Sequence, residues 1–128
     1  MLQDLTPLTL GVRLQHDTVG VLIKRNTSIP CEHEETYYTV RDNQTLVKIR
    51  VVQGESETAS ENHQLGEYMY DGVPEAPAGQ QSVLVKFKIS VDGLLQVTTT
   101  VVSLGTAHEE KIQPQNMNLT AEEVSLML

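Results

Sequence analysis

Five adjacent residues, Cys31-Glu32-His33-Glu34-Glu35, are the part of the sequence with side chains best suited to binding a metal ion. Zinc sites usually repeat Cys or His at short, fixed spacings and use four ligands. Cys31 is the only cysteine of the chain, and the other histidines have no companion at such a spacing. We therefore interpret the cluster as a solvated acidic strand entry, and predict no metal site and no internal disulfide.

Catalytic patterns are equally scarce. The sequence has neither a Gly-x-Ser-x-Gly nucleophile elbow nor a Gly-x-x-x-x-Gly-Lys phosphate loop. The adjacent acids Glu109-Glu110 and Glu122-Glu123 are more typical of a solvated surface than of an acid–base dyad. We therefore predict that the chain is not an enzyme and needs no cofactor of its own.

Composition narrows the class of protein further. With 128 residues the chain is expected to form one domain, and its formal net charge of −8 disfavours binding to nucleic acid or to anionic membranes. The sequence has no run of about 18 apolar residues, which excludes a membrane-spanning helix. A single cysteine is compatible with a reducing compartment, so we expect a cytoplasmic protein.

The elements that would position a site are strands. Val47, Ile49 and Val51 alternate with Lys48 and Arg50, which places the aliphatic residues on one face of a strand and the cations on the other. Similar alternation and regular turn signals predict an all-β, two-layer antiparallel sandwich of about eight strands. The expected strands cover residues 12–14, 19–23, 34–40, 46–53, 65–70, 83–91 and 95–101, with a weaker candidate at 108–113 that Pro114 cuts short.

The connections carry predictions of their own. The stretch from Tyr37 to Glu55 is expected to be two strands joined by a polar turn at 41–44, and residues 54–64 a surface loop. Asp92-Gly93 is expected to form a two-residue hairpin turn, because both positions tolerate positive φ. A short C-terminal helical segment is expected from 119 onward, with Thr120 as its cap.

Five short motifs follow one another along the chain in an order that is typical of a known family. They are Asp4-Leu5-Thr6-Pro7-Leu8-Thr9-Leu10-Gly11, Asn26-Thr27-Ser28-Ile29-Pro30, Asp42-Asn43-Gln44-Thr45, Val52-Gln53-Gly54-Glu55 and Asp92-Gly93-Leu94-Leu95. Each motif alone is weak, but in this order and at this spacing the chain resembles the β-sandwich substrate-binding domain of the seventy-kilodalton heat-shock chaperones. The resemblance covers about residues 4–125.

The resemblance implies a groove, formed by loops at one end of the sandwich, that holds an extended peptide with an aliphatic side chain in a central pocket. From pattern alone, Val47 and Ile49 would more simply be core residues; the resemblance makes them pocket residues. Gln15 and Val40 correspond to the two residues that arch over the peptide. By position, the implied peptide-binding residues are Leu10, which would lie beneath the pocket, and Val12, Leu14, Gln15, Tyr37, Val40, Gln44, Val47, Ile49 and Val83.

This sequence departs from the family at positions that control closure of the groove. Gln15 stands where methionine or alanine is usual, and Ala78 replaces the arginine that helps to latch a helical lid, while its companion Asp42 is retained. Residues 1–3 would be a residual interdomain linker, 4–116 the peptide-binding sandwich, and 117–128 the start of the lid helix or a flexible tail.

The resemblance also implies partners. Asp4, Arg25 and Asp92 correspond to positions that contact an ATPase domain, which would hold ATP and Mg in the parent protein. Hydrophobic extended peptides, unfolded proteins and J-domain co-chaperones are the expected partners. The apolar tail Ser125-Leu126-Met127-Leu128 resembles the peptides that such grooves select, so self-association through the tail is also expected.

Two hypotheses follow. The first is a chaperone substrate-binding domain. The alternative is a divergent homologue that acts as a protein-interaction or regulatory subunit and binds no client peptide, which the departures at Gln15, Ala78 and Pro114 favour slightly. A hydrolase or a metal-binding sandwich is a distant third.

Overall fold

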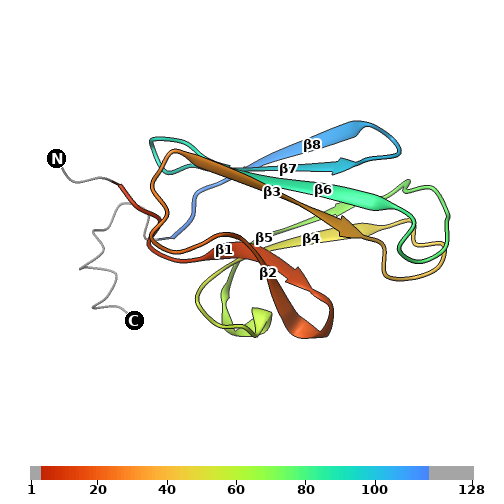
Figure 1. Cartoon of the computed structure of the whole chain (residues 1–128), viewed down its shortest axis with the longest axis horizontal. Helices are drawn as coiled ribbons and strands as arrows, with labels where there is room; N and C mark the ends of the chain where they lie inside the picture. Colours follow the sequence, from red (N-terminus) through yellow and green to blue (C-terminus); the bar gives the residue numbers. More distant parts are fainter. Residues whose placement is uncertain (1–3, 116–128) are drawn as a thin grey trace.

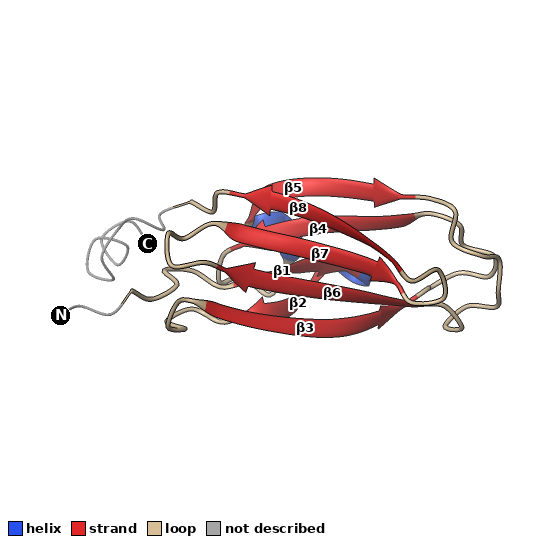
Figure 2. Cartoon of the chain, turned by 90° about the horizontal axis from the view of Figure 1, so that it is seen from above, coloured by secondary structure: helices blue, strands red, loops and turns tan. Residues whose placement is uncertain are grey.

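The computed structural model describes residues 4–115, which form two antiparallel sheets of four strands each (Figure 1). One sheet has the strand order β2-β1-β4-β5 and the other the order β3-β6-β7-β8. Figure 2 looks onto the second sheet, with the first sheet behind it. The predicted two-layer antiparallel sandwich is therefore confirmed. The strands are β1 (Leu10–Leu14), β2 (Thr18–Ile23), β3 (Cys31–Tyr38), β4 (Val47–Gln53), β5 (His63–Tyr70), β6 (Ser82–Ile89), β7 (Leu95–Val101) and β8 (Thr106–Ile112).

The core lies between the sheets and is built from alternating residues. In β6, Val83, Val85, Phe87 and Ile89 are buried, while the side chains between them lie on the outer face. Branched and aromatic side chains suit this arrangement because they pack well on a pleated surface. The alternation ends with the strand: Val91, predicted to continue this face, is 72% exposed.

The stretch from Tyr37 to Glu55 contains the end of one strand, a polar connection and a second strand, as predicted, but the two strands do not pair with each other. β3 and β4 belong to different sheets, so the connection between them carries the chain across the sandwich. Thr39, at the start of this connection, is buried, donates its N–H to Gln81 O at 3.0 Å and accepts from Gly79 N at 2.8 Å. The crossing therefore begins at a fixed point and spans the end of the sandwich.

The turn between β6 and β7 differs from the prediction. Gly93 N donates to Ser90 O at 2.9 Å, and Ser90 N donates to Leu94 O at 3.1 Å, which leaves a three-residue loop. Gly93 has a positive φ of 84°, whereas Asp92 does not. This is a three-residue loop with a left-handed glycine at its end, a common hairpin design that needs only one permissive residue.

Residues 54–64 are more ordered than a surface loop. They contain a short 3-10 helix, η2 (Ala59–Glu61), in which Ala59 is only 1% exposed, and β5 already begins at His63. Asn62 fixes the loop by accepting from Ser56 N at 3.0 Å and donating to Ser56 O at 2.9 Å. The sequence shows no sign of this element because local side-chain hydrogen bonds hold it in place, and these leave no periodic pattern of apolar residues.

The far end of the chain follows the prediction as far as the structure describes it. β8 ends at Ile112, before Pro114, and Pro114 is buried. The predicted linker at 1–3, the tail and the helix from 119 lie outside the described residues. Among residues 4–115, no helix is long and apolar enough to cross a membrane.

Candidate functional site

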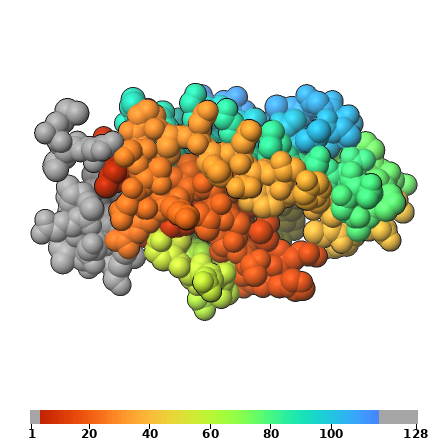
Figure 3. Space-filling view, in the orientation of Figure 1, coloured from red at the N-terminus to blue at the C-terminus, as the bar shows by residue number. Residues whose placement is uncertain are grey.

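A pocket of about 680 Å³ opens at the end of the sandwich where β1 and β3 finish and β4 starts. Figure 3 shows the surface hollowed on this face, between the orange-red β1–β2 segment and the yellow segment that leads into β4. Nine of the ten residues predicted to bind peptide line this pocket: Val12, Leu14, Gln15, Tyr37, Val40, Gln44, Val47, Ile49 and Val83.

Leu10 is the exception. It is fully buried and pairs with Ile23 and Gln53 on the two neighbouring strands, so it belongs to the core below the pocket and not to its lining. Its part in a site is to support the residue two positions further along β1, Val12, which points to the same face of the sheet.

The floor of the pocket is aliphatic. Val12, Val47, Ile49 and Val83 come from three strands in both sheets and are only 2–7% exposed. Each strand contributes alternate residues, which is why the floor has no polar side chain. Such a floor can accept an apolar side chain, because the apolar surface removed from water stabilises the bound state.

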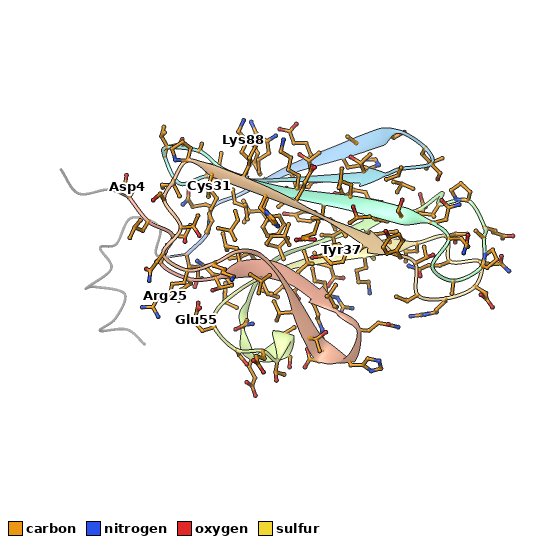
Figure 4. The ribbon with its side chains drawn as sticks, in the orientation of Figure 1. Asp4, Arg25, Cys31, Tyr37, Glu55 and Lys88 are labelled. Atoms are coloured by element: carbon orange, nitrogen blue, oxygen red, sulfur yellow. The ribbon has the colours of Figure 1, made fainter. Side chains whose placement is uncertain are left out.

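The half-buried side chains of Leu14 and Tyr37 form part of the wall. Tyr37 (Figure 4) pairs with Val83 of β6, and its hydroxyl group lies against Gly20 of β2, the edge strand of the other sheet. Burial, with a smaller effect from the charge of Glu35, raises the pKa of Tyr37 to about 12. The phenol is therefore neutral at ordinary pH.

One rim of the pocket is the connection between β3 and β4. Its Gln44 side chain accepts a hydrogen bond from Val40 N and donates one to Leu46 O, both at 2.9 Å. Asp42 accepts a hydrogen bond from Ala78 N at 2.9 Å. Asp42, the predicted latch residue, therefore joins this rim to the β5–β6 connection through the backbone N–H of Ala78. The side chain at position 78, a methyl group, takes no part in this contact.

The opposite rim is the turn between β1 and β2, a short 3-10 segment η1 (Gln15–Asp17) that carries Gln15. His16 and Asp17 have positive φ values of 61° and 57°. Asp17 holds this turn by accepting hydrogen bonds from Ser60 N at 2.9 Å and from Ser60 Oγ, and its carboxylate lies 3.2 Å from Arg13 Nε. The Ser60 hydroxyl is the main reason that the pKa of Asp17 is lowered.

Four cations around the pocket were not among the predicted site residues. They are Arg13, Arg41, Lys48 and Arg50. The alternation in β4 predicts that Lys48 and Arg50 point away from the core, but only the structure shows that both residues also line the pocket. β1 pairs with β4 only as far as the Val12–Val51 pair and then stays with β2.

The residues predicted to contact another domain lie away from the groove. Asp4 and Arg25 are at the end of the sandwich that carries the start of the chain (Figure 4), and the β6–β7 turn with Asp92 lies at the same end (Figure 1). Thr9 joins two loops here: it accepts from Arg25 N at 3.1 Å and donates to Glu55 through its N–H at 2.8 Å and its hydroxyl at 2.6 Å.

The Cys31–Glu35 cluster alternates along β3, so Cys31, His33 and Glu35 share one face and Glu32 and Glu34 the other. His33 Nε2 lies 2.8 Å from Glu35 Oε1 on the exposed part of the strand. Within residues 4–115, no group of three His, Cys, Asp or Glu side chains is arranged to hold an ion.

These features define a class: an antiparallel β-sandwich with an aliphatic-floored groove between the loops of one end. The family model described as "Hsp70 protein" matches residues 1–128. The chain is also 43% identical over 128 residues to "Chaperone protein dnaK" of Thalassiosira pseudonana, a match that covers 100% of this chain and 21% of that relative. The chain belongs to the Hsp70 family, as the motif order indicated, and it spans about a fifth of the length of this curated relative.

Proposed function

We propose that the chain is the substrate-binding unit of a molecular chaperone and holds extended hydrophobic segments of unfolded proteins. The observation that carries this proposal is the pocket itself: an aliphatic floor from both sheets, open to solvent between two hydrogen-bonded rims. Membership of the Hsp70 family and likeness to a protein named as a chaperone support it.

The binding mode follows from the chemistry of the groove. Burial of one leucine or isoleucine side chain on the floor would contribute roughly 1.5–3 kcal/mol. Hydrogen bonds to the backbone of an extended peptide add affinity without demanding a sequence. Binding that rests on one apolar pocket and on backbone contacts tolerates many different clients, as a chaperone requires.

The remaining proposals concern a longer protein. We propose that the chain is not itself an enzyme, and that ATP and Mg are used in a separate ATPase domain. Asp4, Arg25 and Asp92 would face that domain, because they lie at the end of the sandwich opposite the groove. J-domain co-chaperones and a cytoplasmic location complete this proposal.

Fluorescence anisotropy with a labelled, leucine-centred peptide tests the proposed function. We expect saturable binding that Val47→Phe weakens more than tenfold, because an aromatic ring would fill the pocket floor. Val91→Phe is the matched control, since Val91 is exposed and does not line the pocket. Circular dichroism establishes that both variants are folded. Absence of saturable binding, or equal binding by Val47→Phe, would contradict the proposal.

A second candidate is a regulatory or protein-interaction subunit that binds no client peptide. The observation in its favour is that Asp42 is already engaged by the backbone N–H of Ala78, while position 78 carries no arginine side chain that could latch a lid. Such a subunit would retain a defined protein partner in a pull-down even with excess leucine-centred peptide. Loss of that partner on adding peptide would favour the first candidate.

A further inference from the structure

The pocket differs in charge from the rest of the protein. The whole chain has nine Lys and Arg against 17 Asp and Glu, a formal net charge of −8. The residues that line the pocket include four cations, Arg13, Arg41, Lys48 and Arg50, and one acid, Asp42, a formal charge of +3. Almost half of the basic residues of an acidic protein therefore surround one groove.

Nearby carboxylates neutralise these cations only in part. Arg13 Nε lies 3.2 Å from Asp17. Glu67 is shared between two cations, 4.0 Å from Lys48 Nζ and 3.5 Å from Arg50 Nε. Counting Asp17 and Glu67 with the lining residues still leaves a charge of +1, since the four cations face three acids.

Among the four cations that line the pocket, Arg41 is the one whose charge is most accessible to a ligand. It lies exposed on the β3–β4 rim, and none of the ion pairs among residues 4–115 involves it. Its acidic neighbour Asp42 accepts the N–H of Ala78. The Arg41 guanidinium is therefore free to meet an anion that lies along the groove.

The cations also stand on both sides of the apolar floor. Arg13 is on β1, and Lys48 and Arg50 are on β4, at the level where β1 no longer pairs with β4. A peptide with one aliphatic side chain on the floor would place its flanking residues beside these groups. Because successive side chains of an extended peptide point to opposite sides, its neighbours on either side of the buried residue would meet the charged rim.

We propose that this groove selects extended peptides in which the central aliphatic residue is flanked by aspartate or glutamate. This inference rests on the proposed function and specifies its substrate class. Each exposed carboxylate–cation pair is worth on the order of two- to fivefold in affinity, and salt weakens it. Lysine at the same flanks would be repelled by the rim, although the protein as a whole attracts cations.

Three labelled peptides with the same leucine centre and with acidic, neutral or lysine flanks test the inference by anisotropy at low and physiological salt. We expect the acidic peptide to bind about tenfold more tightly than the lysine peptide at low salt, with a smaller ratio at physiological salt. Equal affinities, or a preference for lysine flanks, would overturn the inference while leaving the proposed function intact. If none of the three peptides binds, the proposed function and the inference both fail.

Matched charge variants locate the effect. Arg41→Gln and Lys48→Gln should each lower the acidic-to-lysine ratio by about two- to fivefold. Lys88→Gln removes the same charge from the outer face of β6, away from the pocket (Figure 4), and should leave the ratio unchanged. An equal effect of Lys88→Gln would show that net charge, and not the rim, sets the preference. Circular dichroism of each variant confirms its fold, and the exposed Arg41 leaves no paired partner behind.

Discussion

Gly20 on β2 lies directly against the hydroxyl group of Tyr37 on β3. A Cβ on Gly20 would sit 2.6 Å from Tyr37 Oη, 3.2 Å from its Cζ and 3.0 Å from Leu14 Cδ1. Gly20 has no positive φ, so the strand backbone would accept any residue, and its missing side chain matters for space alone. Both neighbours line the pocket, although Gly20 does not. The missing side chain of Gly20 therefore leaves the space that Tyr37 and Leu14 occupy in the wall of the groove.

Gly20→Ala should narrow the pocket, because the added methyl group displaces Tyr37 and Leu14 toward the pocket that both side chains line. We expect the affinity for a leucine-centred peptide to fall about tenfold and that for an alanine-centred peptide to change little. Anisotropy with the two peptides measures the ratio. Gly66→Ala is the control, because its Cβ would meet Tyr68 Oη at 2.7 Å, a similar clash at a tyrosine that does not line the pocket.

The double variant Gly20→Ala/Tyr37→Phe completes this test. Removal of the phenol oxygen relieves the shortest contact and leaves the 3.2 Å contact to the ring and the 3.0 Å contact to the flexible end of Leu14. Leucine preference should then return to within a few-fold of that of Tyr37→Phe alone. If Gly20→Ala instead binds peptides with larger central side chains more tightly, the wall moves away from the pocket. If the ratio of the two affinities does not change, the wall does not move. Either result would contradict the prediction.

Gln44 should control how fast a peptide leaves. Its side chain joins the two ends of the β3–β4 rim, because it accepts a hydrogen bond from Val40 N and donates one to Leu46 O. Gln44→Ala removes both hydrogen bonds, each worth about 1 kcal/mol, and we expect dissociation of a labelled peptide to accelerate several-fold. Displacement by excess unlabelled peptide measures this rate. Gln64→Ala, on an exposed position of β5, should leave the rate unchanged, and an unaltered rate in Gln44→Ala would exclude a role for this rim.

Most of the fold could be predicted from the sequence because its strands alternate strictly. The alternation in β6, β7 and β4 identifies which side chains face the core, and the structure buries Val85, Val97 and Val51 as expected. The same pattern cannot show which strands pair. The crossing from β3 to β4 has the polar composition of a hairpin turn, and only the sheet order reveals that it spans the sandwich.

The site could be predicted only in part, for a physical reason. Motif order located Val12, Tyr37 and Val47 around one pocket. The charged rim escaped prediction because it depends on where β1 leaves β4, a feature of register that no single strand encodes. The contact of Gly20 with Tyr37 joins residues 17 positions apart in different sheets, so local sequence gives no sign of it.

Gln53 should stabilise the end of the sandwich away from the groove. Its side chain is only 2% exposed, donates to Gln115 O at 2.8 Å and accepts from Gln115 N at 3.0 Å. Gln53→Leu keeps the volume but leaves both backbone groups without this partner, so we expect the free energy of unfolding to fall by about 1–3 kcal/mol. Urea denaturation measures it, with the exposed Gln64→Leu as control. Equal midpoints in the two variants would contradict the prediction.

Two tyrosines should make the protein less stable in alkali. Burial is the main cause that raises the pKa of Tyr37 and of Tyr70 from 10.0 to about 12, and nearby Glu35 and Glu110 add to it. The folded state therefore keeps protons that the unfolded state releases, so this stabilisation is complete below pH 10 and is lost as the pH rises toward 12. We expect urea midpoints to fall across this range and the fall to be shallower in Tyr37→Phe/Tyr70→Phe. The exposed Tyr38→Phe should keep the wild-type slope, and a double variant with an unchanged slope would show that these two phenols do not govern alkaline unfolding.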